Sequence, residues 1–349
     1  MKKVVVAMSG GIDSSVTALL LKNNGFDVTG ITLKMFDNNG IKCCGGDEST
    51  RKFKEICEHI GIRYYVKNAV KIFKRNVIEI FVNEYLSGNT PNPCVYCNRS
   101  IKFDYLLKIA KALGADYIAT GHYARIEKRD GELSLLRGTD NSKDQSYFLY
   151  PIKKEYLKHI IFPVGNMLKS DVKKIAKDNG LPLDISKESK DICFIPEGNY
   201  KIWLKKNGYA TDKPGYIRDT NGNIIGRHNG AYNFTLGQRK KLGVSSDERL
   251  YVKNIDIKTN TITVSRLDES LSKEMILKDI NWLSDKKKKS GKFYAQIRYR
   301  HKPAEGTLEE LDSEHLKFTF NDNQFAITPG QSCVFYDDDR VIGGGTVMQ

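Results

Sequence analysis

The sequence predicts an α/β protein: a domain built on a parallel sheet, then a small mixed domain, then a C-terminal antiparallel β-barrel domain. The first 120 residues alternate short apolar runs with amphipathic helical patterns, which is typical of strands joined by helical crossovers. From about residue 200, glycine and asparagine turn signals are closely spaced. After residue 250, apolar and polar residues alternate as in antiparallel strands. A chain of 349 residues also exceeds what one hydrophobic core normally serves.

The elements of the first domain can be read in order along the chain. We expect strands over residues 3–9, 26–35, 63–68 and 116–122, and helices over residues 13–24, 48–60, 70–86 and 103–114. Ligands of parallel sheets bind at the carboxyl ends of the strands. Those ends carry Ser9-Gly10-Gly11, Met35 and Gly121-His122. From the changes in turn signals and apolar pattern along the chain we expect domains over residues 1–199, 200–269 and 270–349.

The composition limits the class of protein. The chain has 56 Lys and Arg against 42 Asp and Glu, a net charge of +14, which favours a polyanionic partner such as nucleic acid. No run approaches the roughly 18 consecutive apolar residues of a membrane helix, so we expect a cytoplasmic protein without a membrane partner. The seven cysteines, an odd number in a long chain, do not resemble a secreted disulfide framework. Clustered cysteines in a reducing compartment indicate catalysis or metal binding.

The strongest local signal is AMSGGIDSS, residues 7–15, which follows a strand and opens a helix. Backbone N–H groups and the positive end of the helix dipole would face one point there, as a phosphate requires. Gly10 and Gly11 let the backbone approach an anion, and the serine hydroxyls can donate hydrogen bonds to it. Asp13 would repel a bare phosphate, so it predicts a Mg²⁺ ion between the two.

This loop resembles the SGGxDS loop of the ATP pyrophosphatase (PP-loop) superfamily, whose domain is of the adenine nucleotide α-hydrolase type. The resemblance implies that ATP adenylylates a substrate oxygen and that a nucleophile then displaces AMP. The chain offers sulfur as that nucleophile. Cys97, in NPCVYCN, precedes a helix whose dipole is expected to lower the thiol pKa, and Cys193 lies in a predicted loop, DICFIPEG.

Further stretches resemble the family of bacterial tRNA-specific 2-thiouridylases almost from end to end. They are AMSGGIDSS, TPNPCVYCNRSIKFDYLL, GADYIATGHYARI, LLRGTDNSKDQSYFLY, FPVGNMLKSDVKKIAKDNGLP, DICFIPEG, TLGQRKKLG, IRYRHK and TPGQSCVFY. The resemblance implies ATP-dependent 2-thiolation of the wobble uridine of tRNA. The implied partners are the tRNAs for Lys, Glu and Gln, and a sulfur donor, either a cysteine desulfurase or a sulfur-relay carrier.

The same resemblance implies roles for individual residues. ATP would be bound by Ala7, Met8, Ser9, Gly10, Gly11, Ile12, Asp13, Ser14, Met35 and Gly121. Cys97 would be the nucleophile, and Cys193 would carry the persulfide and later form a disulfide with Cys97. The tRNA would be contacted by Asn92, Pro93, Cys94, Lys143, Asp144, Gln145, Arg298 and Tyr299. The basic run KKKKSGKFYAQIRYRHK, residues 286–302, would also suit phosphate contact and base stacking.

Cys94 departs from the family pattern, because many relatives carry an aspartate there that is proposed to transfer a proton. A thiol is a weaker proton shuttle unless its pKa is perturbed. Three alternative functions of the protein stay open. Cys94, Cys97 and Cys193 could hold a [4Fe–4S] cluster that runs the same thiolation. The protein could be a PP-loop RNA ligase that transfers no sulfur. It could also be an RNA-binding protein with a structural zinc on the C-x-x-C.

The other cysteines have plainer interpretations. We expect Cys57, in a helical pattern, and Cys333, in a strand pattern, to be core residues. Cys43-Cys44 is expected to be an incidental surface pair, since vicinal cysteines do not readily share one tetrahedral metal ion.

Overall fold

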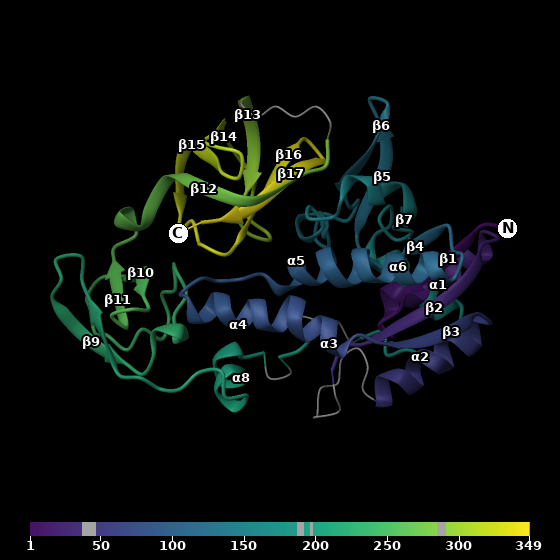
Figure 1. Cartoon of the computed structure of the whole chain (residues 1–349), viewed down its shortest axis with the longest axis horizontal. Helices are drawn as coiled ribbons and strands as arrows, with labels where there is room; N and C mark the ends of the chain where they lie inside the picture. Colours follow the sequence, from purple (N-terminus) through teal and green to yellow (C-terminus); the bar gives the residue numbers. More distant parts are fainter. Residues whose placement is uncertain (37–46, 187–191, 196–197, 285–290, 349) are drawn as a thin grey trace.

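The fold contains three sheets, and Figure 1 shows them as three bodies around a central pair of helices. The computed structural model describes residues 1–36, 47–186, 192–195, 198–284 and 291–348. Cys43-Cys44 and the lysine run at 286–289 lie outside the described residues. The predicted fold class is confirmed: a parallel α/β sheet, a small mixed domain and a C-terminal antiparallel barrel.

The first sheet is parallel and five-stranded, in the order β3-β2-β1-β4-β7. Its strands are β1 (Lys3–Ala7), β2 (Asp27–Lys34), β3 (Arg63–Asn68), β4 (Tyr117–Ala119) and β7 (Ile160–Ile161). The first four match the predicted strands, and β7 was not predicted. Two apolar clusters fill the two faces of the sheet, one around Val5 and Ile31 and the other around Val4 and Val6.

Helices cover both faces of this sheet. Those that contact its strands are α1 (Ile12–Asn23), α2 (Asp47–Ile60) and α6 (Leu106–Ala112). The other α-helices of the described residues are α3 (Val70–Phe73), α4 (Glu79–Leu86), α5 (Pro93–Cys97), α7 (Lys169–Asp178) and α8 (Tyr200–Lys206). Two π-helical segments interrupt the central pair: Lys74–Ile78 joins α3 to α4, and Asn98–Tyr105 joins α5 to α6. Short 3₁₀ helices occur at Ser146–Phe148, Lys154–His159, Ala231–Asn233 and Asp268–Ser270.

The expected start of the helix at residue 103 is wrong, because the cysteines already belong to the helix. Helix α5 begins at Pro93, and the Asn92 side chain accepts a hydrogen bond from the Cys94 N–H at 3.2 Å. Asparagine at the N-cap followed by proline at the first helical position is a strong start signal. The prolines of this stretch therefore mark a helix start and not a loop.

The middle sheet has four strands in the order β10-β11-β8-β9 and its own apolar core. Its strands are β8 (Gly215–Arg218), β9 (Ile224–His228), β10 (Tyr251–Asp256) and β11 (Thr261–Ser265). The pair β8–β11 is parallel and the other pairs are antiparallel, which agrees with the expected mixed domain.

The third sheet is antiparallel, has eight strands, and is closed by a pairing of β12 with β17. Six strands come from the C-terminal part: β12 (Leu271–Trp282), β13 (Gly291–Gln296), β14 (Ala304–Glu310), β15 (Leu316–Phe325), β16 (Ser332–Asp337) and β17 (Arg340–Val347). The other two, β5 (Ala124–Arg129) and β6 (Glu132–Arg137), come from the first domain and were not predicted. The β6 strand adds to the barrel sheet beside β17, with Leu136 opposite Arg340.

Ion pairs secure this junction. Arg340 of β17 pairs with Glu132 of β6, and Arg125 of β5 donates to Asp339 at 2.6 Å. Both arginines are mostly buried, so these contacts are less screened by solvent than surface pairs. The first domain and the barrel are therefore one packed unit. Among the described residues, no helix has the length and apolar character needed to cross a membrane.

Candidate functional site

The loop that the sequence predicts to bind phosphate, within residues 7–15 and called the phosphate loop below, lies between β1 and α1. Gly10 has a φ of +76°, and the N-cap residue Gly11 makes no side-chain capping hydrogen bond. Ser9 and Gly11 are exposed, while the Ser14 hydroxyl donates to the Gly11 carbonyl oxygen at 3.0 Å. The side chains of Met8 and Ile12 are buried in the core, so these two residues can offer a ligand only their backbone.

A lysine that the sequence analysis did not single out completes this loop. The Lys169 ammonium, at the start of α7, lies 2.5 Å from Oδ1 of Asp13, and the Tyr123 hydroxyl donates to the same oxygen at 2.7 Å. Lys169 is buried, and its Nζ lies 5.6 Å from the centre of the Tyr123 ring. A fixed positive charge therefore stands beside a loop that has no lysine of its own between residues 7 and 15. The signal was present in FPVGNMLKSDV, but the pairing partner is distant in sequence.

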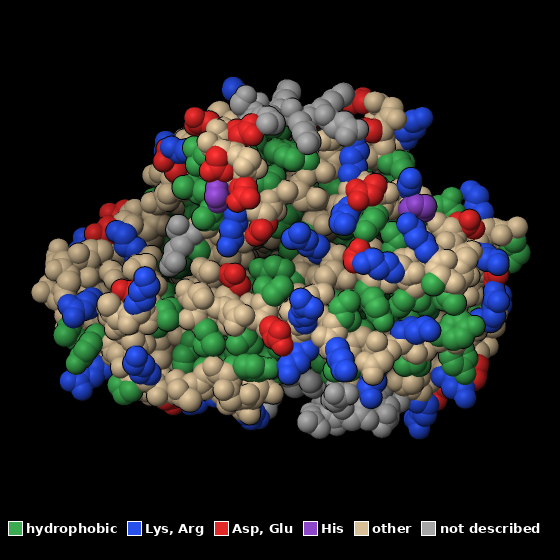
Figure 2. All heavy atoms as spheres, in the orientation of Figure 1, with side chains coloured by type: hydrophobic (Ala, Val, Ile, Leu, Met, Phe, Trp, Pro, Cys, Tyr) green, Lys and Arg blue, Asp and Glu red, His purple; other side chains and the backbone are tan. Residues whose placement is uncertain are grey.

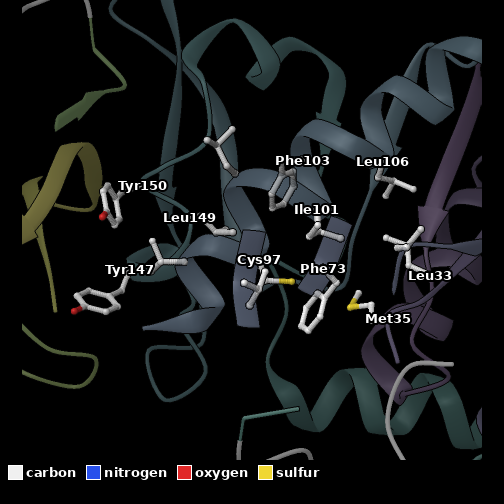
Figure 3. Close-up of a cluster of buried hydrophobic side chains, with 14 of the residues drawn as sticks. Leu33, Met35, Phe73, Cys97, Ile101, Phe103, Leu106, Tyr147, Leu149 and Tyr150 are labelled. Atoms are coloured by element: carbon white, nitrogen blue, oxygen red, sulfur yellow. The ribbon is translucent and has the colours of Figure 1, made fainter. Parts of the chain in front are cut away.

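Gly121, at the carboxyl end of β4, packs directly on the first turn of α1. A Cβ added there would lie 2.7 Å from the Asp13 carbonyl carbon and 2.8 Å from the Ser14 nitrogen. Only glycine allows this approach of two backbones, so the predicted juxtaposition of residue 121 with the loop is real. Met35, at the end of β2, is buried in the same apolar cluster as Cys97 (Figure 3).

The two thiols of the C-x-x-C differ in access. Cys94 is exposed and Cys97 is 7% exposed, with its sulfur directed toward Phe73 in Figure 3. Burial raises the pKa of Cys97 to about 11, although the Lys102 charge acts in the opposite direction. The protein atoms close around Cys94 raise its pKa as well. The expected lowering of the Cys97 pKa by the helix dipole is therefore wrong, because desolvation of the thiolate outweighs it.

Cys193 lies in the turn at 192–195 and is half-buried. It packs against the apolar cluster that contains Cys97, and its neighbour Phe194 is buried between the Phe73 and Phe81 rings at 5.9 and 5.2 Å. Phe73 therefore connects the surroundings of both cysteines. The two sulfurs are not joined by a disulfide in this structure.

Residues 120–122 connect the phosphate loop with the helix formed by residues 93–112, which carries Cys94 and Cys97 and is called the cysteine helix below. Gly121 packs on Asp13 and Ser14, and the next residue, His122, lies with its Nε2 3.4 Å from the Lys102 Nζ on the helix that carries Cys97. The Thr120 hydroxyl lies 2.6 Å from the His122 Nδ1. The end of β4 thus places the two predicted halves of the site next to each other.

The predicted tRNA segment Lys143-Asp144-Gln145 is built mainly on internal contacts. The Asp144 carboxylate is buried, pairs with Arg137 at 2.8 Å and accepts the Gly138 N–H at 3.0 Å. The Gln145 Oε1 accepts the Tyr123 N–H at 3.0 Å. Asp144 and Gln145 therefore hold this loop in shape, and Gln145 binds it to Tyr123, which follows β4. Lys143 is half-exposed.

The predicted pair Arg298-Tyr299 is also held from within. Arg298 donates to the Phe325 and Ala326 carbonyl oxygens, and Tyr299 packs on the Phe148 ring at 4.5 Å. The next residue, Arg300, is exposed, with its guanidinium 5.5 Å from the Tyr299 ring centre. Arg300 is the outward cation of this segment, a difference from Arg298 that no signal in the sequence indicates.

Metal binding can be tested on the described residues. They contain no group of three or more His, Cys, Asp or Glu side chains arranged to hold a metal ion. Cys94, Cys97 and Cys193, all described, are therefore not arranged as the ligands of an iron–sulfur cluster.

Lysine and arginine side chains are spread over the whole face seen in Figure 2, interspersed with acidic groups and not gathered into one patch.

Comparison with known proteins gives matches over nearly the whole chain. Residues 2–197 match a family described as tRNA methyl transferase HUP domain, residues 204–266 one described as tRNA methyl transferase PRC-barrel domain, and residues 272–347 one described as aminomethyltransferase beta-barrel domain. Among solved structures, a 4-thiouridine synthetase in complex with RNA and ATP is 20% identical, with a TM-score of 0.39, over 60% of this chain and 50% of that chain. This likeness is distant.

Curated relatives are far closer. A protein of Clostridium perfringens is 42% identical over 353 residues, which cover 99% of this chain and 98% of the relative. A protein of Clostridium beijerinckii is 43% identical with the same coverage, and one of Halothermothrix orenii is 43% identical over 100% of this chain and 99% of its own length. All three are named tRNA-specific 2-thiouridylase MnmA.

Proposed function

The chain belongs to the tRNA-specific 2-thiouridylase family, and we propose that it is an ATP-dependent transferase that replaces O2 of the wobble uridine of tRNA with sulfur. The observation that carries this function is the position of residues 120–122, which touch both the phosphate loop and the cysteine helix. A site that first activates an oxygen and then delivers sulfur needs these two parts within reach of one substrate base. The tRNAs for Lys, Glu and Gln are the expected substrates.

ATP would lie with its phosphates at the first turn of α1. Gly11 leaves the N–H groups of that turn without a side-chain cap, and Lys169 adds a positive charge beside Asp13. Tyr123 and Lys169 both contact Oδ1 of Asp13, so Oδ2 could contribute to a Mg²⁺ ion bound mainly by the phosphates. The ion would neutralise phosphate charge, while Lys169 and the helix end orient the α-phosphate toward the uridine O2.

Sulfur transfer would use the two cysteines that share the Phe73 cluster. A persulfide on Cys193 attacks C2 with its terminal sulfur, and AMP leaves with the former O2. The Cys97 thiolate then attacks Sγ of Cys193, so that a Cys97–Cys193 disulfide forms and the electron pair of the broken S–S bond goes to the sulfur on C2. The persulfide could instead release sulfide by the same attack, and sulfide would then add to C2. A thiol reductant restores both cysteines.

Cys94 would lie beside the base, together with Asn92 and Pro93. Its raised pKa keeps it protonated at neutral pH, so it can act as a proton donor but not as a base.

The tRNA backbone would be bound by the outward cations Lys143 and Arg300, next to the stacking face of Tyr299. Asp144, Gln145 and Arg298 would support these groups from inside. A cysteine desulfurase or sulfur-relay carrier would load Cys193.

The test is mass spectrometry of nucleosides from purified tRNA after incubation with the protein, ATP, Mg²⁺, a thiol reductant and a cysteine desulfurase with cysteine, which supplies persulfide sulfur, with and without iron. We expect 2-thiouridine without added iron. The variant Cys193→Ser should lose thiolation and keep ATP and tRNA binding, and retained thiolation would sink the assignment of Cys193. A PP-loop ligase that transfers no sulfur would form AMP without 2-thiouridine, and its chemistry would continue in the Cys193→Ser variant.

A further inference from the structure

The helix that carries the cysteines changes its pitch directly after Cys97. Residues 93–97 are α-helical, Asn98–Tyr105 is π-helical, and α6 follows. Five residues along an α-helix turn the side chain about 140° away from the starting one. In a π-helix the backbone hydrogen bonds join residues i and i+5, so the fifth residue returns toward the starting side. Lys102 is the fifth residue after Cys97, and the π-helical segment turns it toward the cysteines.

Contacts confirm where the ammonium of Lys102 lies. Its Nζ is 3.4 Å from Nε2 of His122, whose Nδ1 is 2.6 Å from the Thr120 hydroxyl. An ammonium can only donate, so Nε2 accepts and Nδ1 carries the proton of a neutral imidazole. The His122 ring is buried between the Phe103 and Phe162 rings, with centroids at 5.8 and 6.0 Å. A fixed, neutral imidazole therefore holds the lysine head group.

Among the residues that the structure describes, the titratable groups around Cys97 come from three elements. Cys94 and Lys102 lie on its own helix, His122 follows β4, and Cys193 is in the turn at 192–195. The π-helical segment Lys74–Ile78 packs against α5. Its residue Val77 and the preceding Phe73 are apolar members of the cluster that contains Cys97. Lys102 lowers the pKa of both Cys94 and Cys97, and it also lowers that of His122. Burial and the neighbouring Cys94 oppose it at Cys97.

We propose that Lys102 is the positioning cation of the sulfur-transfer site, held by His122 so that its ammonium stabilises the anionic sulfur of Cys97 when that sulfur attacks Cys193. The role rests on the proposed function, because the attack is its second step. In that step the Cys97 thiol loses its proton to solvent, the new S–S bond forms to Sγ of Cys193, and the S–S bond of the carrier breaks. Negative charge develops within a mostly apolar cluster, where one fixed cation has a large effect.

The test is alkylation of Cys97 by iodoacetamide in the full-length protein, followed peptide by peptide by mass spectrometry between pH 7 and 10 without ATP or tRNA. Lys102→Met should slow alkylation of Cys97 at pH 8 by about 10-fold, the effect of roughly one pKa unit. Lys102→Arg should restore the rate to within about 2-fold, since it keeps the charge. Lys111→Met, which removes an exposed charge from α6 of the same helix, should alkylate like the unchanged protein.

Equal alkylation of Lys102→Met and Lys111→Met would overturn the proposal, as would a rate in Lys102→Arg as low as in Lys102→Met. If Lys102→Met does not fold, Lys102→Gln is measured in its place with the same expected loss. The alkylation rate can be measured without thiolation, so it tests the role of Lys102 separately from the proposed thiolation function. A protein that forms no 2-thiouridine but shows the Lys102 effect would refute the function and keep the role of Lys102 toward the thiols.

Discussion

Lys169 and Asp13 lie 156 positions apart in the sequence, and the ammonium of the first is 2.5 Å from the carboxylate of the second. The pair joins the first turn of α7 to the phosphate loop, with the Tyr123 hydroxyl on the same oxygen. A positive charge thus stands beside the site where ATP would place its phosphates, and it is held there before any nucleotide binds.

Removing this charge should weaken nucleotide activation. We expect Lys169→Met to lower kcat/KM for ATP-dependent AMP formation by about 10- to 100-fold, because a mostly buried charge pair is broken and a phosphate contact is lost. Tyr123→Phe should cost less, about 2- to 10-fold, since it removes one hydrogen bond. Lys174→Met, an exposed lysine on the same helix, serves as the control. Unchanged AMP formation in Lys169→Met would refute the role.

The close packing of Gly121 on α1 makes a second prediction. In Gly121→Ala the new methyl carbon would lie 2.7 Å from the Asp13 carbonyl carbon, so the two backbones must separate. We expect ATP binding, measured by calorimetry, to weaken at least about 10-fold, because the backbone N–H groups at the start of α1 move away from the phosphates that they would bind. Circular dichroism should show a folded protein at the assay temperature. Full ATP affinity in this variant would contradict the proposed nucleotide position.

Phe194 should hold the sulfur-carrying turn in place. Its ring is 1% exposed and packs on Phe81 and Trp203 at centroid distances of 5.2 Å each. Phe194→Ala should reduce the free energy of unfolding by about 3–5 kcal/mol, measured in urea, because it leaves a cavity. Thiolation should fall while AMP formation persists.

Phe320→Ala is the matched control for that variant. Phe320 is 2% exposed, but it lies in the core of the barrel. We expect a similar loss of stability and no selective loss of thiolation. If both variants thiolate equally well at a temperature where both are folded, Phe194 has no part in placing Cys193.

His122 should make stability depend on pH. Burial, and then the Lys102 charge, lower the pKa of His122 well below 6.5, so the imidazole stays neutral in the folded protein. Below pH 6.5 the unfolded chain binds a proton there and the folded chain does not, so the free energy of unfolding decreases as the pH falls. The lowered pKa values of His228 and His301 act in the same direction.

The measurement for His122 is urea unfolding between pH 5 and 7. His122→Gln should flatten the dependence of the unfolding free energy by up to about 1.4 kcal/mol per pH unit, the value for one proton. The slope that remains belongs to the other histidines. Parallel curves for the variant and the unchanged protein would show that His122 takes up its proton equally in both states.

Local signals in the sequence predicted the parts of the site that depend on neighbouring residues. The phosphate loop and the first four strands are of this kind, since apolar periodicity and glycine turns act over short distances. The start of the cysteine helix was mispredicted although its signal, Asn92 followed by Pro93, is local. The direction of the Cys97 pKa could not be read from the helix alone, because it depends on how many groups from other elements cover the thiol.

Contacts between distant segments carried no such signal. Lys169 reaches Asp13, and β6 reaches β17, only after the whole chain has folded. The same holds for Asp144, whose type suggests a surface loop although its carboxylate is tied to Arg137 inside the protein. Pairings of this kind depend on tertiary geometry, which a single sequence does not display.

The hairpin of β5 and β6 sets an order of events during synthesis. The edge of β6 must wait for β17, Arg340–Val347, the strand with which it pairs when the hairpin extends the barrel sheet. While the ribosome makes the intervening 200 or so residues, the hairpin presents unpaired N–H and C=O groups of the type that invites wrong partners. The charged residues Glu132, Arg125 and Arg137, which the finished protein uses to bind the C-terminal strands and the Asp144 loop, would protect that edge in the nascent chain.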